Sequence, residues 1–311
     1  MNVNSLLYRW LDGFTKERVK SRTYSRYRGL IAQHIAPVLG EVEISQLSRR
    51  HVTEFLQSEK AMGNRRGGEM LSAASTNLML TILHSACEYA CDMEWLCENP
   101  CDRVRRLPDH TAGRAEAFDR REQQVLETTL RRLSDRRLFG VRLCLYTGLR
   151  IGELLALEWR DIDFDAGTLR IQRTVYRDRG EDGIWRLCTD SPKSQSSARL
   201  IPLPPHILQE LCEHRKTAQS RFVIENKKGG QMPVRSYQYL FEKLTERSGV
   251  RKLNFHALRH TFATRALECG MDIRTLSEIM GHKNPSITLN RYAHSMMDTK
   301  TAMMHRMSSL I

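Results

Sequence analysis

The chain has 311 residues, which is enough for two domains that each bury a core. Its 49 lysines and arginines outnumber its 36 aspartates and glutamates, so the formal net charge is +13. This excess favours a polyanionic partner such as nucleic acid over a merely basic enzyme, because phosphate neutralisation releases counterions. No apolar run reaches the length of a membrane span, and the N-terminus lacks a signal-peptide core. We therefore expect a soluble, cytoplasmic protein without membrane contact.

Residues 3–107 are predicted to be almost entirely helical. Tyr27, Ile31 and Ile35 form an apolar stripe at helical spacing. Breakers at Pro37 with Gly40, and again at 62–68, are expected to separate the helices. The helical stretches run over 5–19, 22–35, 48–60 and 72–96.

Charge within this helical part is polarised. A solvated face explains either block alone, but both together suggest one side for DNA and another for solvent or protein. The acidic block comprises Glu88, Asp92, Glu94 and Glu98. The candidate DNA-binding residues are Lys16, Arg18, Lys20, Arg22, Arg26 and Arg28, together with Arg65 and Arg66 in the turn at 62–68.

Eight cysteines are scattered along the chain, which favours reduced thiols over a disulfide framework. Cys87, Cys91, Cys97 and Cys101, with His84 nearby, could in principle hold a metal. Their spacing is not that of a C-x2-C knuckle, and small residues around them are typical of a helix core. We expect ordinary core positions and no metal.

The second half begins after a charged, aperiodic linker around 101–118. Helices near 119–146 are followed by strand-like runs, in which Leu169, Ile171 and Val175 keep an alternating phase. From Pro204 the pattern is helical again. We expect a mainly helical domain with one small antiparallel sheet. The predicted organisation is domain 1–108, linker 109–117, domain 118–295 and a tail helix over 296–311.

One helix, "HALRHTFATRAL" over 256–267, combines an apolar stripe with unusual chemistry. His256, Arg259 and His260 lie at i, i+3 and i+4, so they can share one face. Taken alone, this stretch is read as a solvated face with one core histidine.

Four further features accompany this helix. In "TGLRIGELLALEW", Gly148 ends one helix and Arg150 begins the next, where Glu153 can reach back to the guanidinium. In "SPKSQSSARLIPLP", Lys193 sits in a turn between two strand-like runs, so its ammonium can project from a hairpin tip.

The remaining two features lie near the C-terminus. Asp272 is the expected N-cap of a helix that Gly281 ends, and His282 follows directly. Asn284 caps the next helix, Pro285 takes its first position, and Tyr292 falls two turns later. The pair of helices could be a helix-turn-helix DNA reader, but that reading leaves Arg150 and Lys193 unexplained.

The ordered set Arg150, Lys193, His256-x-x-Arg259, His282 and Tyr292 resembles the tyrosine recombinase (phage integrase) family, including integrases of conjugative transposons and phages. The helical segment 1–107 is similar to that family's core-binding domain. The resemblance implies a mainly α fold, with a helical core DNA-binding domain and a mixed α/β catalytic domain.

It also implies a site-specific recombinase of a mobile genetic element. Such an enzyme cuts and rejoins double-stranded DNA through a 3′-phosphotyrosine and a Holliday junction. It acts as a homo-tetramer on DNA, and we expect a monomer when free. Many integrases carry an additional N-terminal arm-binding domain, whereas this sequence begins almost directly at the core-binding helices. A recombinase that needs only core sites and a shortened chain both fit this beginning.

The chemistry of phosphodiester cleavage agrees with these residues. Without a metal, arginines must supply the positive charge on the phosphate. Since the covalent phosphotyrosine conserves bond energy, no cofactor is expected. Glu153 is assigned a supporting role, and His260 is either catalytic or structural. The catalytic assignments are Arg150 and Arg259 as phosphate clamp, His256 and His282 as further phosphate contacts, Lys193 as acid for the 5′ oxygen and Tyr292 as nucleophile.

Two other functions remain open from sequence. A type IB topoisomerase uses similar residues as a monomer, and a catalytically idle DNA-binding regulator needs none of them. In the tail, Asp298 can cap a helix that places Met303, Met307, Leu310 and Ile311 on one face. That face packs either on its own domain or, as the resemblance implies, on a neighbouring protomer.

Overall fold

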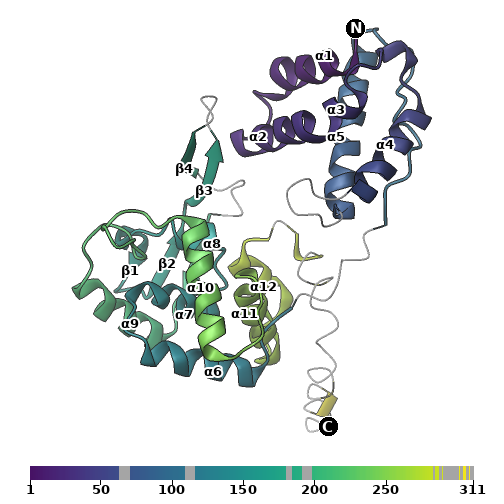
Figure 1. Cartoon of the computed structure of the whole chain (residues 1–311). Helices are drawn as coiled ribbons and strands as arrows, with labels where there is room; N and C mark the ends of the chain where they lie inside the picture. Colours follow the sequence, from purple (N-terminus) through teal and green to yellow (C-terminus); the bar gives the residue numbers. More distant parts are fainter. Residues whose placement is uncertain are drawn as a thin grey trace. The chain divides into compact units, whose positions relative to one another are not determined.

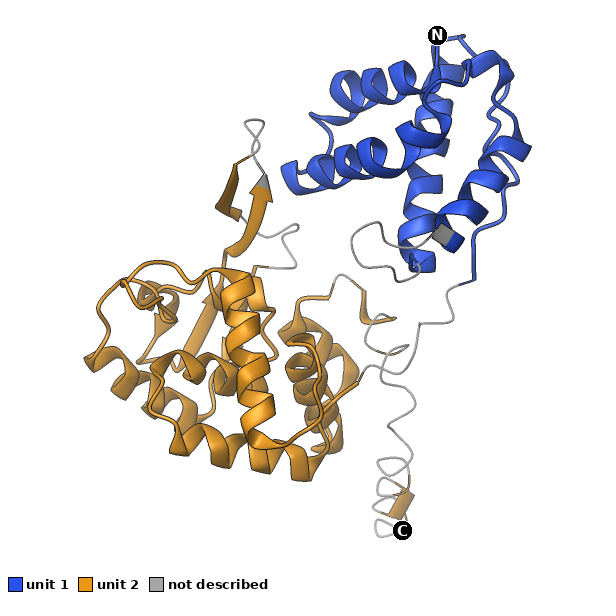
Figure 2. Ribbon diagram, in the orientation of Figure 1, with its two compact units in different colours: residues 1–113 blue, residues 114–311 orange. Residues whose placement is uncertain are grey.

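The computed structural model describes residues 1–62, 71–108, 116–179, 184–190 and 198–282, and eight residues beyond these (284–286, 289, 301, 304, 305 and 308). The chain divides into two compact units, residues 1–113 and 114–311 (Figure 2). Both are built mainly from helices, and the second also contains small antiparallel sheets (Figure 1). This architecture confirms the predicted fold class. Within the described residues, no helix has the length and apolar character needed to cross a membrane.

The first unit packs one face of each of its helices into a single core. Ile31 and Ile35 are fully buried and Tyr27 packs against them, as their spacing predicts. The elements are α1 (Val3–Tyr8) with the π-helical η1 (Arg9–Thr15), α2 (Ser21–Leu30) with η2 (Ile31–Ile35), α3 (Ala36–Leu39), η3 (Ile44–Gln46), α4 (Arg49–Met62) and α5 (Ala73–Asp92).

Of the predicted breaker pair Pro37 and Gly40, Gly40 is confirmed and Pro37 is not, because the chain stays helical from Ser21 to Leu39. Pro37 lies in the first turn of α3, directly after the π-helical turn η2. Pro37 therefore lies inside a continuous helix, where it lacks the backbone N–H that would donate to the preceding turn. The helix instead ends at Gly40.

Two of the four cysteines of α5 and the following loop are core positions, as predicted, and two are not. Cys87 and Cys101 are buried, Cys91 is half-buried and Cys97 is exposed, and all are free thiols. A hydrogen bond with Cys87, together with burial, raises the pKa of the Cys101 thiol. A thiol whose pKa is raised stays protonated at neutral pH and is a poor nucleophile or metal ligand.

The second unit is organised around α7 and α11, which pack against each other. The chain enters this core at Phe118, which is fully buried and whose backbone N–H donates to the Thr261 hydroxyl at 2.9 Å. Its helices are α6 (Arg120–Arg132), α7 (Phe139–Thr147), α8 (Ile151–Leu154), α9 (Pro205–Lys216), α10 (Val234–Ser248), α11 (His256–Glu268) and α12 (Ile273–Met280), with the short turns η4 (Arg136–Leu138) and η5 (Trp159–Asp161).

The described residues of the second unit form two sheets, so the prediction of a single sheet is wrong. Strands β1 (Ile162–Asp163), β2 (Thr168–Ile171) and β5 (Arg199–Pro202) form one antiparallel sheet in the order β1-β2-β5. Strands β3 (Thr174–Arg179) and β4 (Trp185–Asp190) form a separate hairpin (Figure 1).

The sequence pattern does not show where one sheet ends and the other begins. Leu169, Ile171 and Val175 are all buried, as their alternation predicts, and their phase continues unchanged from β2 into β3. The chain leaves the first sheet at Arg173, whose guanidinium lies 2.5 Å from the carboxylate of Asp161 and 3.4 Å from that of Glu158. These ion pairs with η5 and the residue before it anchor the bend, and alternation alone cannot reveal them.

Candidate active site

The first arginine of the predicted set follows a tight turn between α7 and α8. Gly148 adopts a left-handed conformation (φ 63°), and a Cβ there would lie 2.5 Å from the Phe262 ring, so only glycine fits. Arg150, two residues later, is the N-cap of α8. Glu153 accepts hydrogen bonds from the Arg150 backbone N–H (3.0 Å) and from its Nη1 (2.8 Å). The predicted contact between Glu153 and Arg150 is therefore confirmed.

Arg259 lies on α11 and is only 1% exposed, so the reading of this helix face as solvated is wrong for it. Its Nη1 donates to the Gly148 carbonyl (2.8 Å) and its Nη2 to the Met280 carbonyl (2.6 Å). Nη2 also lies 2.9 Å from His282 Nε2. A guanidinium has no acceptor, so Nε2 must accept this bond and the imidazole proton sits on Nδ1.

The turn after α12 places His282 beside Arg259. Asp272 caps α12 by accepting from the backbone of Arg274 and Thr275, at 2.9 and 3.0 Å. Gly281 ends the helix in the left-handed conformation (φ 62°), and the His282 N–H donates to the Ser277 carbonyl at 3.0 Å. These predicted caps are confirmed.

The predicted cap at Asn284 is confirmed as well. Its side-chain oxygen accepts from the Ser286 N–H at 2.9 Å, and Pro285 is the first residue of the helical turn that follows.

The two histidines of α11 differ in exposure. His256 begins the helix and is exposed, whereas His260, one turn later, is buried. Their rings meet edge to face with centroids 4.6 Å apart. His256 therefore has the more accessible ring of the two, and the buried His260 packs against it.

Together these contacts form a positively charged site at the C-terminal end of α12. Arg150 Nη2 donates to the Gly281 carbonyl at 3.3 Å, next to the carbonyl that Arg259 binds. The Arg150 side chain is 37% exposed, so an anion can reach it. Fixed guanidinium groups beside an imidazole suit a tetrahedral anion such as a phosphate.

Arg199, at the start of β5, is a site residue that the sequence reasoning missed. Its Nη2 and Nη1 donate to the two carboxylate oxygens of Glu153 at 2.9 and 3.2 Å, and its Nε donates to the Ile279 carbonyl at 2.5 Å. The available signal was a charged residue opening the otherwise apolar "LIPLP" run. The sequence around Arg199 does not indicate which residues it binds, because Glu153 and Ile279 are 46 and 80 residues away.

Glu153 stays ionised in this setting. Burial by itself raises its pKa, but the hydrogen bonds and charge of Arg199 and the charge of Arg150 outweigh burial and lower the pKa to about 2. Because the folded-state pKa lies below the unfolded value, Glu153 stabilises the fold fully above that unfolded value. This stabilisation is lost as the pH falls towards 2. One carboxylate therefore faces two arginines, Arg150 and Arg199, and with Arg259 added the site keeps a net positive charge.

Several predicted residues fall outside the described part of the chain: Lys193, Tyr292, Arg65 and Arg66, and most of the tail over 296–311. The described strands on either side of Lys193 are β4 and β5, which belong to different sheets. Lys193 itself lies outside the described residues, so its place at a hairpin tip stays a prediction; the described β4 and β5 are not paired with each other. In the described residues, consecutive strands pair as hairpins at β1–β2 and at β3–β4.

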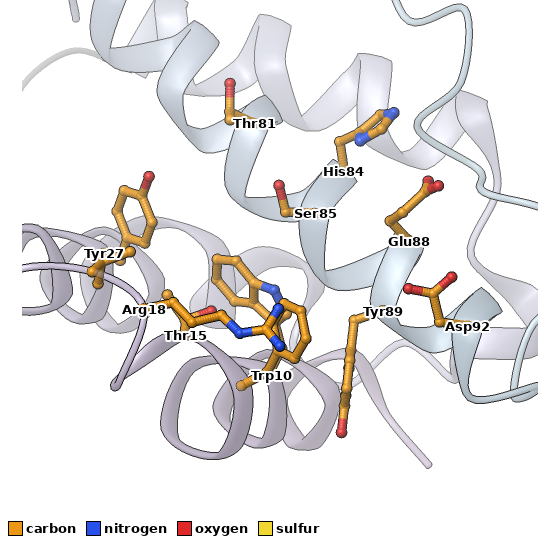
Figure 3. Close-up of a pocket in the computed structure, with 12 residues that line it drawn as sticks. Trp10, Thr15, Arg18, Tyr27, Thr81, His84, Ser85, Glu88, Tyr89 and Asp92 are labelled. Carbon is orange, nitrogen blue, oxygen red and sulfur yellow. The ribbon is translucent and has the colours of Figure 1, made fainter.

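In the first unit, five of the six basic residues between 16 and 28 are exposed, and Lys20 is half-buried. Arg18 stacks on Phe14, 3.8 Å from the ring centroid, at the edge of a cavity of about 370 Å³. Glu88 and Asp92 of the acidic block line the same cavity, with Trp10 among its aromatic residues (Figure 3). The prediction that the two charge blocks occupy different sides is thus wrong at this point. No described candidate catalytic residue lines the cavity.

Comparisons with known proteins agree with the geometry. Residues 2–59 match the phage integrase N-terminal SAM-like domain. A XerC-like tyrosine recombinase of Caldanaerobacter subterraneus is 25% identical over 343 residues, covering all of this chain and 83% of the relative. The ICEBs1 integrase of Bacillus subtilis is 26% identical, covering 94% of this chain and 79% of the relative.

Solved structures give the same result. The Tn1549 transposon integrase, in complex with transposon right end DNA, superposes with a TM-score of 0.82 at 26% identity, covering 99% of this chain and all of the other. A lambda integrase tetramer bound to a Holliday junction shares the fold, with a TM-score of 0.68 at 17% identity over 92% of this chain and 78% of the other. The phage integrase family itself matches residues 119–299, which contain every residue of the site described above and more than half of the sequence; the chain belongs to the phage integrase family.

Proposed function

We propose that the chain is a tyrosine site-specific recombinase, which cuts and rejoins DNA through a 3′-phosphotyrosine and exchanges strands through a Holliday junction. The observation that carries the proposal is the anchoring of Arg150, Arg259 and His282 around the end of α12. Membership of the phage integrase family gives this anion site its substrate, the phosphodiester of DNA.

The arginines stabilise the charge that develops on the phosphate as it becomes pentacoordinate. Arg259 is held by two backbone carbonyls before the substrate arrives, so little reorganisation is needed at the moment of reaction. Arg150 presents its partly exposed guanidinium to the same anion. His256 adds an imidazole at the N-terminus of α11, and His282 adds a second one beside Arg259.

The bond changes involve two residues that the sequence supplies. The Tyr292 oxygen attacks phosphorus, and the bond from phosphorus to the 5′ oxygen breaks. Lys193 protonates that departing oxygen. The phenol has an ordinary pKa near 10, so the neighbouring cations must help it to lose its proton. Rejoining is the reverse attack by a 5′ hydroxyl, which needs no nucleotide cofactor because the phosphotyrosine conserves the bond energy.

DNA binding and assembly complete the proposal. Residues 1–108 act as the core DNA-binding domain and 118–295 as the catalytic domain, joined by 109–117, and the tail 296–311 contacts the next protomer. We expect a monomer free in the cytoplasm and a homo-tetramer on double-stranded DNA. The proposed DNA contacts are Lys16, Arg18, Lys20, Arg22, Arg26, Arg28, Arg65 and Arg66.

The test is to trap the covalent intermediate. The full chain is incubated with 5′-labelled duplexes that carry a randomised segment and a nick, so that a cleaved strand loses its short 3′ fragment and cannot rejoin. A labelled protein–DNA adduct that survives denaturing electrophoresis, with EDTA present, is the expected result. Its DNA gives the preferred sequence. No adduct above a heat-denatured control would contradict the proposal, and relaxation of any supercoiled plasmid would indicate a topoisomerase instead.

DNA affinity should depend steeply on salt. Each neutralised phosphate contributes about 0.9 to the slope of log affinity against log salt. Replacing both Arg22 and Arg26 with glutamine, which removes two exposed cations of α2, should lower the slope by up to about 2. Lys216→Gln, at an exposed ion pair with Glu213 on α9, is the matched control and should leave it unchanged. Fluorescence anisotropy at several salt concentrations measures the slopes, and equal slopes for all variants would remove α2 from the interface.

Lys193 can be tested through its leaving group. Lys193→Ala should cleave ordinary DNA slowly, because the 5′ oxygen then departs without a proton. A 5′-phosphorothiolate leaves as a thiolate that needs no proton, so the variant should cleave this substrate nearly as fast as the wild type. Single-turnover adduct formation measures both rates. Equal defects on the two substrates would assign Lys193 to phosphate contact rather than acid catalysis.

A further inference from the structure

We propose that Arg199 is a positioning residue. By binding Glu153 it orients Arg150 towards the scissile phosphate, and by binding Ile279 it fixes this arrangement against the end of α12. The role rests on the proposed recombinase function. Arg199 is itself too buried to meet the substrate, since 6% of its side chain is exposed and its guanidinium binds Glu153 and Ile279.

The first observation is a row of three backbone carbonyls. Ile279, Met280 and Gly281 are consecutive at the C-terminal end of α12, and each carbonyl accepts from a different arginine. Arg199 donates to Ile279, Arg259 to Met280 and Arg150 to Gly281. The last carbonyls of a helix lack intrahelical partners and lie at its negative end, so they attract cations. The end of α12 therefore spaces three guanidinium groups in a fixed order, directly before His282.

The second observation is how Glu153 is shared. One carboxylate oxygen accepts from Arg150 Nη1 (2.8 Å) and Arg199 Nη1 (3.2 Å). The other accepts from the Arg150 backbone N–H (3.0 Å) and Arg199 Nη2 (2.9 Å). Because Arg199 takes both oxygens with its planar fork, Arg150 keeps one guanidinium nitrogen on Glu153 and another on Gly281.

Charge explains why this sharing matters for the reaction. With Arg199 present, one carboxylate is balanced by two arginines, and a positive charge remains for the phosphate. Without it, the buried carboxylate would pair with Arg150 alone, neutralise it and draw its guanidinium away from solvent. An arginine that has been neutralised in this way stabilises a phosphate poorly.

The third observation is the lack of space for a side chain at Gly281. A Cβ at this position would lie 2.9 Å from Arg199 Nη1, and the backbone has φ 62°. Because it has no side chain, the glycine that ends α12 also leaves the space that the Arg199 guanidinium occupies.

The experiment compares single-turnover adduct formation on two substrates that carry the recovered sequence. One has a normal scissile phosphate, and the other has a methylphosphonate there, which lacks the negative charge. On the phosphate, Arg199→Met should cleave at least tenfold more slowly than the wild type. Combining Arg199→Met with Arg150→Ala should be no slower than Arg150→Ala alone, since both act through one guanidinium. On the methylphosphonate, both single variants should lose most of their defect.

Arg173→Met is the matched control, because Arg173 is another largely buried arginine bound to acidic residues of the same unit. A substitution that only damages the structure, as Arg173→Met is meant to, should show a fold-loss in cleavage rate that multiplies with that of Arg150→Ala and is equal on both substrates. Should Arg199→Met fail to show the wild-type circular dichroism spectrum, Arg199→Lys replaces it, since lysine keeps the charge but loses the fork.

The outcomes separate this role from the proposed function. A wild type that forms no adduct overturns the recombinase proposal and this role with it. If the wild type cleaves, three results would overturn the positioning role alone. The Arg199 variant cleaves at the wild-type rate, or its fold-loss in rate multiplies fully with that of Arg150→Ala, or it is equally slow on both substrates.

Discussion

Replacing Tyr292 with phenylalanine is expected to abolish the covalent protein–DNA adduct while leaving DNA binding at the wild-type level. The substitution removes one phenolic oxygen, which is the proposed nucleophile, and leaves the arginines that hold the phosphate. Adduct formation on the nicked substrate and electrophoretic mobility shift of intact DNA measure the two properties separately.

Tyr146→Phe provides the matched control for this result. The Tyr146 hydroxyl lies 3.2 Å from the Glu127 carboxylate on the second unit, and nothing in the proposed reaction uses it. This variant should form the adduct at the wild-type rate. An adduct formed by Tyr292→Phe at the wild-type level would assign the nucleophile to a different residue.

Loss of either clamp arginine should slow cleavage by about two orders of magnitude or more. Removing one preorganised donor to a developing charge typically costs roughly 3 kcal/mol. Arg150→Ala is the direct test for Arg150, since its side chain is partly exposed and Glu153 keeps its ion pair with Arg199. Single-turnover adduct formation at saturating protein gives the rate.

Arg259 needs a different substitution because it is buried against two carbonyls. Alanine would leave the carbonyls of Gly148 and Met280 unpaired and would destabilise the unit as well as the reaction. Arg259→Lys keeps the charge but loses the fork, and should still cleave far more slowly than the wild type. Arg142→Ala, which removes a largely buried ion pair with Glu210, is the control and should cleave normally. Wild-type rates in Arg150→Ala or Arg259→Lys would exclude that residue from the site.

The helices and their ends could be predicted because the signals are local. A stripe at 3.6-residue spacing buries Ile31 and Ile35, and Asp272, Gly281 and Asn284 cap helices through atoms a few residues away. The contact between Glu153 and Arg150 is equally local, at three residues. The division into two sheets was missed because the apolar alternation keeps its phase across the bend at Arg173.

By itself, then, the sequence determined which chemical groups are present, the order of the motif residues and the local caps that present them. Tertiary structure alone decided that Arg259 is buried, that Arg199 joins Glu153 to Ile279, and that three arginines line the end of α12. These bonds cross 21 to 131 residues of chain. Their partners are brought together by the packing of α11 on α7 and of α12 on α11 and β5, and periodicity within a segment carries no information about which other segment covers it.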